Sequence, residues 1–349
     1  MGASAGDAIT SMALNMRAVL REYGRSEIFA VFPDPSIGNE VLPIQQLDDH
    51  DDGKLLVYHA SYGLRDLTER LERRRGDLVL CYHNVTPAHF FDDIDPAFAD
   101  GLRWGKQEIA VLRPRVRHAF ADSTFNAHDL DAAGYSDIEI LPIGVDSQKL
   151  LEFPPDIRLA NHYSRLFPSG YVIAVSQLLP HKNIEMAVAA VHQLREVWGF
   201  DLGLVIVGIE RSGPYASGVR NLAGRLLGDH FRMTGRLNDR QLSTLQRHAT
   251  LYLGMSAHEG LSVPLIDSMA LGVPAVVRSV GAVAETAGDG AQVVDPSAGP
   301  EEIARSCAQI LLDHESRRQL IVRGLKRAET FRKEIILDRF RESLSGLLT

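Results

Sequence analysis

Short apolar runs alternate with longer amphipathic stretches along the whole of this 349-residue chain. Short apolar runs predict buried strands and the stretches between them predict helices, so we expect an α/β protein with parallel strands. The strands predicted in the first half are 27–32, 54–58, 77–82, 119–121 and 138–141. Those predicted in the second half are 171–175, 202–207, 231–234, 251–255, 275–278 and 292–294.

One segment, 146–168, breaks this rhythm and carries Pro154, Pro155 and Pro168. Because prolines interrupt helices and strands, we interpret it as the connection between two domains. The predicted parts are an amino-terminal domain at 1–150, a linker at 151–168 and a carboxy-terminal domain at 169–330. A last helix at 331–349 is expected to pack back on the first domain. Few residues precede the Gly6-Asp7 turn, so the first strand is expected to be short or missing.

Composition narrows the class of protein. The formal net charge of -8 argues against nucleic-acid binding. Cys81 and Cys307 lie far apart, which fits a reduced, cytoplasmic compartment and offers no zinc cluster. No apolar run approaches ~18 residues and the start lacks a basic-then-apolar leader, so neither a spanning helix nor a signal peptide is expected.

The segment HEGLSVPLID, residues 258–267, carries the strongest functional signal. It joins the predicted strand 251–255 to a predicted helix whose first turn suits Pro264. The backbone amides of such a turn and the positive end of the helix favour a phosphate or a polyhydroxyl ligand. The residues of the turn are Gly260, Leu261 and Ser262.

Two carboxylates flank this turn. Glu259, at its mouth, can accept hydrogen bonds from sugar hydroxyls, and Asp267, about one turn into the helix, could reach a ribose. The spacing resembles the carboxylate-x7-carboxylate motif of retaining glycosyltransferases with the GT-B fold, specifically glycosyltransferase family 4, or glycosyl transferases group 1. The usual form has Glu at both ends and Gly-Phe-Gly after the first. An ordinary strand-turn-helix with two surface acids is the alternative.

The resemblance implies two Rossmann-like domains that face each other across a cleft. It also implies a retaining hexosyltransferase of glycan, glycolipid or polysaccharide synthesis. The donor would be a nucleotide-diphospho sugar, and the acceptor a saccharide or a lipid-linked molecule. It implies no cofactor, no metal and no nucleic-acid partner. The expected location is the cytoplasm, with a peripheral contact at the inner face of the membrane.

Further segments resemble the donor site of the family. In VSQLLPHKN, residues 175–183, Lys182 matches a lysine that would neutralise the donor diphosphate, and Gln177 stands where the family has an arginine. In FRMTGRL, Gly235 and Arg236 are candidates for the wall against the nucleotide base. For Lys182 the alternative is a solvated lysine at a helix start.

The amino-terminal half contributes two candidates. His83 follows the predicted strand 77–82, at the end of the sheet where ligands bind. The resemblance places it beside the donor sugar; the alternative is a loop histidine that caps the strand end. Gly6-Asp7 resembles the loop that faces the reacting centre, but Asp7 equally fits the N-cap of the helix 8–23.

Other polar groups are interpreted as structural. His59, His89 and His118 are expected to be structural or on the surface, and Asp122-Ser123 to be structural. In Asp93-Ile94-Asp95 a helix cap before Pro96 is favoured over a metal site. For the basic stretch 103–117 we favour a solvated helix face. The alternative is a surface that faces an anionic acceptor or a membrane. For the whole chain, the alternative function is a non-catalytic sugar-nucleotide-binding protein or partner subunit on the same fold.

Overall fold

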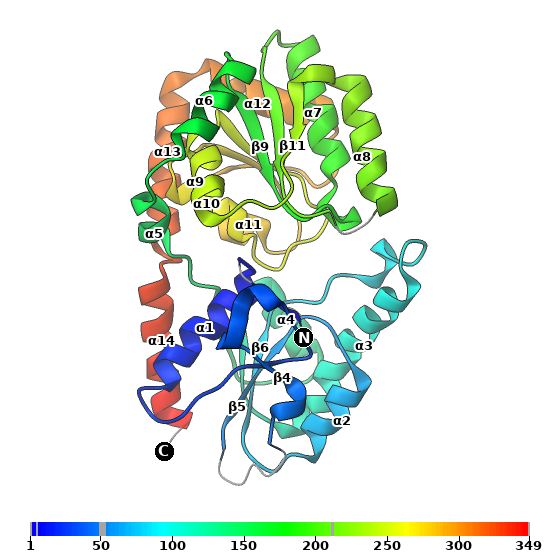
Figure 1. Ribbon diagram of the computed structural model, residues 1–349, viewed down its shortest axis with the longest axis vertical. Helices are drawn as coiled ribbons and strands as arrows, with labels where there is room; N and C mark the ends of the chain where they lie inside the picture. The colour runs from blue at the N-terminus through cyan, green and yellow to red at the C-terminus, as the bar shows by residue number, and fades with distance from the viewer. Residues whose placement is uncertain (1, 5, 49–53, 211–212, 348–349) are drawn as a thin grey trace. The chain divides into compact units, whose positions relative to one another are not determined.

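The structure is a computed structural model that describes residues 2–4, 6–48, 54–210 and 213–347. The chain forms two compact units, Met1–Gly144 with Lys333–Thr349, and Val145–Arg332. Each unit contains parallel strands with helices beside them (Figure 1). The segment 151–168, expected to connect the two domains, lies in the second unit and includes helix α6 (Ile157–Leu166).

The second unit has a six-stranded parallel sheet in the order β11-β10-β9-β12-β13-β14. Its strands are β9 (Tyr171–Val175), β10 (Gly203–Val207), β11 (Phe231–Met233), β12 (Leu251–Gly254), β13 (Ala275–Arg278) and β14 (Gln292–Val294). Runs rich in Val, Ile and Leu form these strands because both faces of the sheet are covered. The strand order reverses between β9 and β12, which is the topological switch point of the sheet.

Helices cover both faces of this sheet (Figure 1). On one face, α7 (Ile184–Glu196), α8 (Gly213–Leu226) and α12 (Pro300–Leu312) share an apolar core with the strands. On the other lie α9 (Asp239–His248), α10 (Val263–Ala270) and α11 (Val283–Ala287). The unit is completed by α5 (Ser147–Glu152), α6 and α13 (His314–Glu329).

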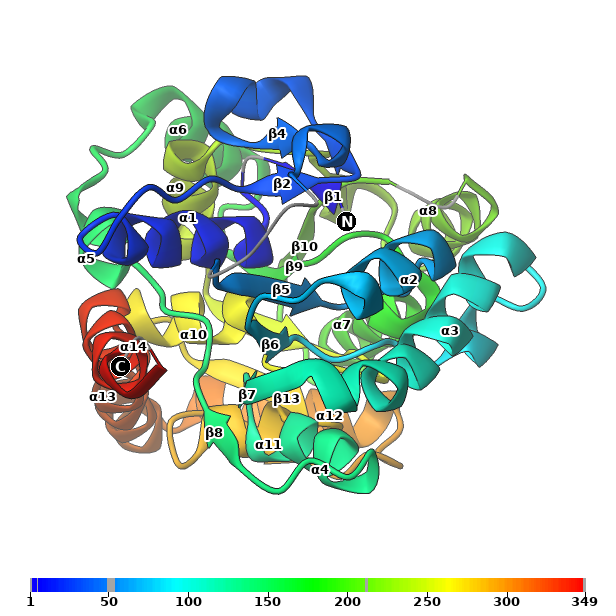
Figure 2. The same ribbon diagram turned by 90° about the horizontal axis from the view of Figure 1, so that it is seen from below.

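The first unit contains a four-stranded parallel sheet in the order β5-β6-β7-β8, which Figure 2 shows side by side. Its elements are β5 (Leu56–Ala60), α2 (Arg65–Arg73), β6 (Leu78–Tyr82), α3 (Pro96–Leu112), β7 (Val116–Ala121), α4 (Thr124–Ala132) and β8 (Ile138–Ile140). Before them come α1 (Ala8–Leu20) and two short parallel pairs. These pairs are β1 (Gly2–Ala3) with β3 (Phe32–Pro33), and β2 (Phe29–Ala30) with β4 (Leu42–Pro43).

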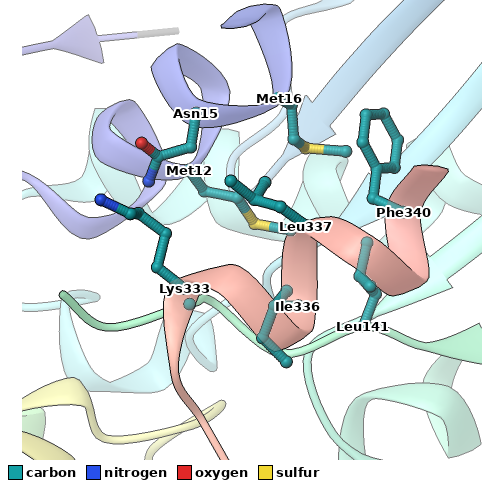
Figure 3. Close-up of a pocket in the computed structure, with 9 residues that line it drawn as sticks. Met12, Asn15, Met16, Leu141, Lys333, Ile336, Leu337 and Phe340 are labelled. Carbon is teal, nitrogen blue, oxygen red and sulfur yellow. The ribbon is translucent and has the colours of Figure 1, made fainter. Parts of the chain in front are cut away.

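The last helix, α14 (Lys333–Leu347), belongs to the first unit and packs against α1. Figure 3 shows Met12 and Met16 of α1 facing the α14 side chains Ile336, Leu337 and Phe340 around a small cavity of about 10 Å³. Methionine suits such an irregular contact because its unbranched side chain adapts to its neighbours. The end of the chain therefore contributes to the core of the unit that its beginning forms.

A buried carboxylate joins three elements of the first unit. Glu108 of α3 is fully buried and accepts hydrogen bonds from the Tyr58 hydroxyl at 2.9 Å and the Thr68 hydroxyl at 2.6 Å. Trp104 Nε1 donates to the same Thr68 oxygen at 2.9 Å. Burial raises the pKa of Glu108 to about 7, although both hydrogen bonds oppose this shift.

The raised pKa of Glu108 predicts that this group's contribution to stability falls as the pH rises. The usual pKa of 4.5 applies to Glu108 in the unfolded chain, so between pH 4.5 and about 7 the unfolded state loses a proton that the folded state keeps. Stability from this group should therefore fall by roughly 3 kcal/mol across that window. In urea titrations at pH 5 and pH 8, Glu108→Gln should remove the share of the pH dependence that Glu108 contributes and leave that of Asp267, whose pKa is also about 7. The exposed Glu69→Gln of α2 is the matched control, and an unchanged pH profile in Glu108→Gln would contradict the assignment.

Among the described residues, no helix has both the length and the apolar character needed to cross a bilayer.

Candidate functional site

Two loops flank the switch point of the second unit, one after β9 and one after β12. They are joined directly: the Ala257 amide donates to the His181 carbonyl at 2.7 Å, and Asn183 Nδ2 donates to the Met255 carbonyl at 3.1 Å. The carboxyl ends of the strands at a switch point are where open α/β sheets bind ligands. The loops therefore form one continuous surface at the place where a ligand is expected.

A lysine and a glutamate meet on this surface. Lys182 Nζ lies 2.8 Å from Glu259 Oε1, and the two side chains remain 19% and 16% exposed. The Ser256 hydroxyl donates to the same Glu259 oxygen at 2.6 Å. The pair thus presents a cation and a carboxylate that are held in place but still accessible to a ligand.

The turn that follows Glu259 has an unusual backbone. Ser262 adopts the left-handed conformation, with φ 77° and ψ 66°, immediately before α10. This conformation is costly for a residue other than glycine, and strained residues of this kind cluster at functional sites. Thr286 Oγ1 supports the turn by donating to the Leu261 carbonyl at 2.5 Å. Hydrogen bonds from neighbouring residues therefore fix the conformation of the turn that precedes the positive amino-terminal end of α10.

A second close contact fixes Glu259 itself. The Ala282 amide donates to the Glu259 carbonyl at 3.0 Å. Gly281 has φ 54°, and a Cβ placed on it would lie 2.1 Å from the same carbonyl oxygen. A side chain at position 281 would therefore displace the backbone that carries the carboxylate.

Asp267 lies half-buried in α10. Burial, with a smaller contribution from Asp239, raises its pKa to about 7. Tyr252 of β12 makes a hydrogen bond with Ser262, and burial and the carboxylates of Glu259 and Asp267 raise the pKa of its hydroxyl. Tyr252 and Ser256 are members of this cluster that the sequence analysis missed.

The remaining candidates of the second unit follow the neighbouring strands. The Leu178 amide, next to Gln177, donates to the Ile209 carbonyl at 2.9 Å. The Gly208 amide donates to the Gly235 carbonyl at 3.1 Å, and Arg236 is exposed beside it. The loops that follow β9, β10 and β11 therefore contact one another. The candidates of the second unit lie at the carboxyl ends of the strands of its sheet.

In the first unit, His83 is part of a buried chain of hydrogen bonds. Its Nδ1 lies 2.9 Å from Asp122 Oδ2, and its Nε2 lies 2.8 Å from Nδ1 of His59. The side chains of His83 and Asp122 are 1% and 4% exposed. Because a carboxylate accepts, His83 Nδ1 donates to Asp122, and Nε2 of a neutral His83 then accepts from His59. Both ring nitrogens of His83 are therefore engaged inside the unit.

These hydrogen bonds include two residues whose contacts with His83 the sequence analysis did not predict. Burial keeps the pKa of His59 well below its usual value, and burial raises the pKa of Asp122 while the nearby His83 opposes that shift. His59 was expected to be structural or on the surface, and Asp122 to be structural. Both lie at the carboxyl ends of strands adjacent to the one before His83. The pairing of parallel strands is the signal that could have identified them.

Asp7 caps helix α1, which was one of its two predicted roles. Its Oδ2 accepts from the Thr10 amide at 2.8 Å and from the Thr10 hydroxyl at 2.7 Å. Gly6 before it has φ 75°. A further role of Gly6 and Asp7 toward a reacting centre stays a prediction.

Two other segments have clear structural roles. Asp95 is the N-cap of α3 and accepts from the Phe98 amide at 3.0 Å, as predicted for the Asp93-Ile94-Asp95 segment. Within the described ranges, no group of three or more His, Cys, Asp or Glu side chains is arranged to hold a metal ion. The basic residues of 103–117 each bind a group of their own unit, while Arg103, Arg113 and Arg117 stay exposed, so the favoured solvated face remains a prediction. These pairs are Arg103 with Asp92, Lys106 with Asp129, Arg113 with Gly134, Arg115 with Arg74, and Arg117 with Asp77.

Solved glycosyltransferase structures share this architecture over nearly the whole chain. Anabaena HepE, in a complex with UDP and glucose, has a TM-score of 0.78 at 16% identity, covering 99% of this chain and 97% of its own. WaaG, a glycosyltransferase involved in lipopolysaccharide biosynthesis, has a TM-score of 0.72 at 14% identity, covering 99% and 98%. The chain therefore has the GT-B fold with two Rossmann-like units, and the predicted fold class is confirmed.

The sequence of the second unit resembles a known family. The model described as glycosyl transferases group 1 matches residues 168–327, which confirms the resemblance seen in the sequence. MMP alpha-(1->4)-mannosyltransferase of Mycolicibacterium hassiacum is 29% identical over 195 residues, 55% of this chain and 44% of the relative. GDP-mannose-dependent alpha-(1-6)-phosphatidylinositol monomannoside mannosyltransferase of Mycobacterium tuberculosis is 30% identical over 194 residues, 51% and 48%. The chain thus spans about half the length of these relatives.

Proposed function

We propose that this protein is a retaining hexosyltransferase that uses a nucleotide-diphospho sugar. The second unit would hold the donor, and the first would bind a saccharide or lipid-linked acceptor, in the cytoplasm or at the inner face of the membrane. One observation carries the proposal: the Lys182–Glu259 pair lies at the switch point beside the amino-terminal end of α10. The relatives named as mannosyltransferases and the neighbour that binds UDP and glucose support it.

The chemistry assigns each group a role. Transfer breaks the bond between the anomeric carbon and the diphosphate oxygen, and negative charge develops on the diphosphate. The Lys182 ammonium and the positive end of α10 would stabilise that charge. Glu259 would accept hydrogen bonds from the sugar hydroxyls, and Asp267 from the ribose. Gln177, Gly235 and Arg236 would line the rest of the nucleotide site. The acceptor would attack the anomeric carbon on the same face from which the diphosphate leaves.

The roles of His83, Gly6 and Asp7 would concern the reacting sugar. His83 Nε2 contacts His59, so His83 can hold a sugar hydroxyl or the developing oxocarbenium ion only if that contact opens. This requirement makes His83 the candidate whose catalytic role most needs a direct test.

A ligand screen tests the proposal. Thermal unfolding is measured with GDP, UDP, ADP and dTDP sugars, beginning with GDP-mannose because that donor appears in the name of a relative. A ligand at 100 times its dissociation constant adds about 2.7 kcal/mol of stability, which such a screen detects. Donor hydrolysis without acceptor is then measured. Stabilisation without hydrolysis or transfer would favour the alternative, a non-catalytic sugar-nucleotide-binding protein, and no stabilisation by any donor would contradict both.

Lys182→Ala should weaken the binding of nucleoside diphosphates. A hydrogen bond to a charged group contributes about 1.5–3 kcal/mol, which corresponds to about tenfold or more in affinity. Titration calorimetry with GDP and UDP measures the loss, and the exposed Lys326→Ala of α13 is the matched control. Gln177→Arg should instead tighten binding, because it adds a second cation. Unchanged diphosphate affinity in Lys182→Ala would remove this lysine from the site.

Transfer should continue in EDTA, because Lys182 and the end of α10 are proposed to stabilise the diphosphate without a metal. Initial rates are compared before and after chelation. A loss of activity that Mn²⁺ or Mg²⁺ restores would overturn the metal-free assignment.

A further inference from the structure

The hydrogen bonds that join Asp122, His83 and His59 run in one direction. As a carboxylate, Asp122 accepts, so His83 donates through Nδ1 and presents a lone pair at Nε2. His59 must then donate to that lone pair through its own Nδ1, which lies 2.8 Å away. Because a neutral imidazole carries a single N–H, a lone pair is left on Nε2 of His59.

The two imidazole rings are well placed for this contact. Their planes differ by 4° and their centroids lie 5.0 Å apart, which fits two rings that meet edge to edge through their nitrogens. The N–H of His59 therefore points along the lone pair of His83. Hydrogen bonds in such a row polarise one another, so the carboxylate of Asp122 makes the far lone pair, on Nε2 of His59, a better acceptor.

The far nitrogen is also the one that a ligand can use. Both ring nitrogens of His83 are engaged, and its side chain is 1% exposed. His59 is half-buried, and in the part of the chain that the structure describes its Nε2 makes no hydrogen bond. Burial keeps the pKa of His59 well below its usual value, so the ring stays neutral and keeps this lone pair. His59 lies near the carboxyl end of β5, where open α/β sheets bind ligands.

We propose that His59, and not His83, is the imidazole that touches the saccharide, and that its Nε2 accepts a hydrogen bond from a sugar hydroxyl. His83 and Asp122 are then positioning residues behind it. The inference rests on the proposed function, which brings a sugar to this unit. It leaves the His59–His83 contact closed, whereas a direct role of His83 requires that contact to open.

Two amide variants separate the two nitrogens of His59. The amide of Asn lies close to the place of Nδ1, so His59→Asn can keep the hydrogen bond to His83 but offers nothing to a ligand. The amide of Gln reaches the place of Nε2, so His59→Gln can accept from a hydroxyl but gives up His83. A His59 that faces the ligand predicts higher turnover in His59→Gln than in His59→Asn.

Turnover per folded molecule should fall about tenfold in His59→Asn, the effect of one hydrogen bond. The exposed His89→Asn of the same unit is the matched control, and thermal unfolding measures the folded fraction of each variant. Higher turnover in His59→Asn than in His59→Gln would show that His59 only holds His83, and would overturn the proposal. Wild-type turnover in both variants would overturn it as well.

Nitrogen-15 chemical shifts of the histidine rings provide a readout that needs no turnover. The direction of the hydrogen bonds predicts a protonated Nδ1 and an unprotonated Nε2 in both His59 and His83. GDP-mannose is added as the source of a donor sugar, and methyl α-mannoside as the source of an acceptor hydroxyl. One of them should shift Nε2 of His59 and leave Nε2 of His83 nearly unchanged, and the one that does so identifies which sugar His59 binds.

Thermal unfolding of the same samples distinguishes failure of this inference from failure of the proposed function. Stabilisation by GDP-mannose with neither probe shifting Nε2 of His59 would overturn the role of His59 alone. A shift of Nε2 of His83 in its place would assign the contact to His83. No stabilisation by any of the donor sugars would contradict the proposed function and this inference together.

Discussion

Glu259→Gln is expected to lower the rate of sugar transfer by roughly 10²–10³-fold, the range seen when one preorganised polar contact to a reacting group is lost. The substitution keeps the size of the side chain but removes the charge that would bind sugar hydroxyls. It also removes the charged partner of Lys182, whose Nζ lies 2.8 Å from Glu259 Oε1. The affinity for free nucleoside diphosphate should therefore be maintained or increase while turnover falls. This split distinguishes loss of a catalytic contact from loss of the binding site.

Two measurements on the same protein make this result decisive. Turnover is measured with saturating donor, and GDP and UDP affinity by calorimetry. The exposed Glu301→Gln in the first turn of α12 is the matched control, with the same change of charge in the same unit. Wild-type turnover in a folded Glu259→Gln protein would exclude Glu259 from the site.

His83→Ala is expected to have a large effect on both stability and turnover. Asp122, 4% exposed, would lose its hydrogen-bond donor, and leaving a buried carboxylate without its partner costs about 3–5 kcal/mol. If His83 also acts on the sugar, turnover per folded molecule should fall far more than nucleotide affinity, since an interaction made in the transition state lowers turnover and catalytic efficiency together.

Two further variants separate a structural role of His83 from a catalytic one. His59→Ala removes the other partner of His83 without removing His83 itself. The exposed His89→Ala is the matched control. A catalytic His83 predicts a much larger loss of turnover in His83→Ala than in His59→Ala. Equal losses of stability with unchanged turnover per folded molecule would assign His83 to support of the strand end.

The strands of the second unit could be predicted well because each is a continuous apolar run between turn residues. The predicted limits of β9, β13 and β14 match the structure. The amino-terminal region was harder to predict. A single strand was expected at 27–32, but β2 and β3 are separate two-residue pieces that pair with different strands. β4, which contains Pro43, gives no alternation to detect. Strands this short depend on their neighbours and not on their own pattern.

The candidate site shows the same limit. Lys182 and Glu259 were identified through the family resemblance, and 77 residues separate them in the sequence. Their contact depends on β9 and β12 being neighbours in the sheet, which the strand order alone determines. The contact of His59 with His83 was not predicted because it requires the register of β5 against β6. Residue types indicated the chemistry, but pairing between distant strands determines which side chains meet.

The glycines beside the site limit how this protein could be engineered. A Cβ on Gly208 would lie 1.7 Å from the Ser176 carbonyl oxygen, next to Gln177, and one on Gly281 would lie 2.1 Å from that of Glu259. A mutant library aimed at a new donor should therefore keep positions 208 and 281 constant, although neither glycine offers a side chain to a ligand. Diversity is better placed at Gln177 and Arg236, whose side chains are proposed to line the nucleotide site. The search for altered specificity then covers fewer positions and loses fewer variants to misfolding.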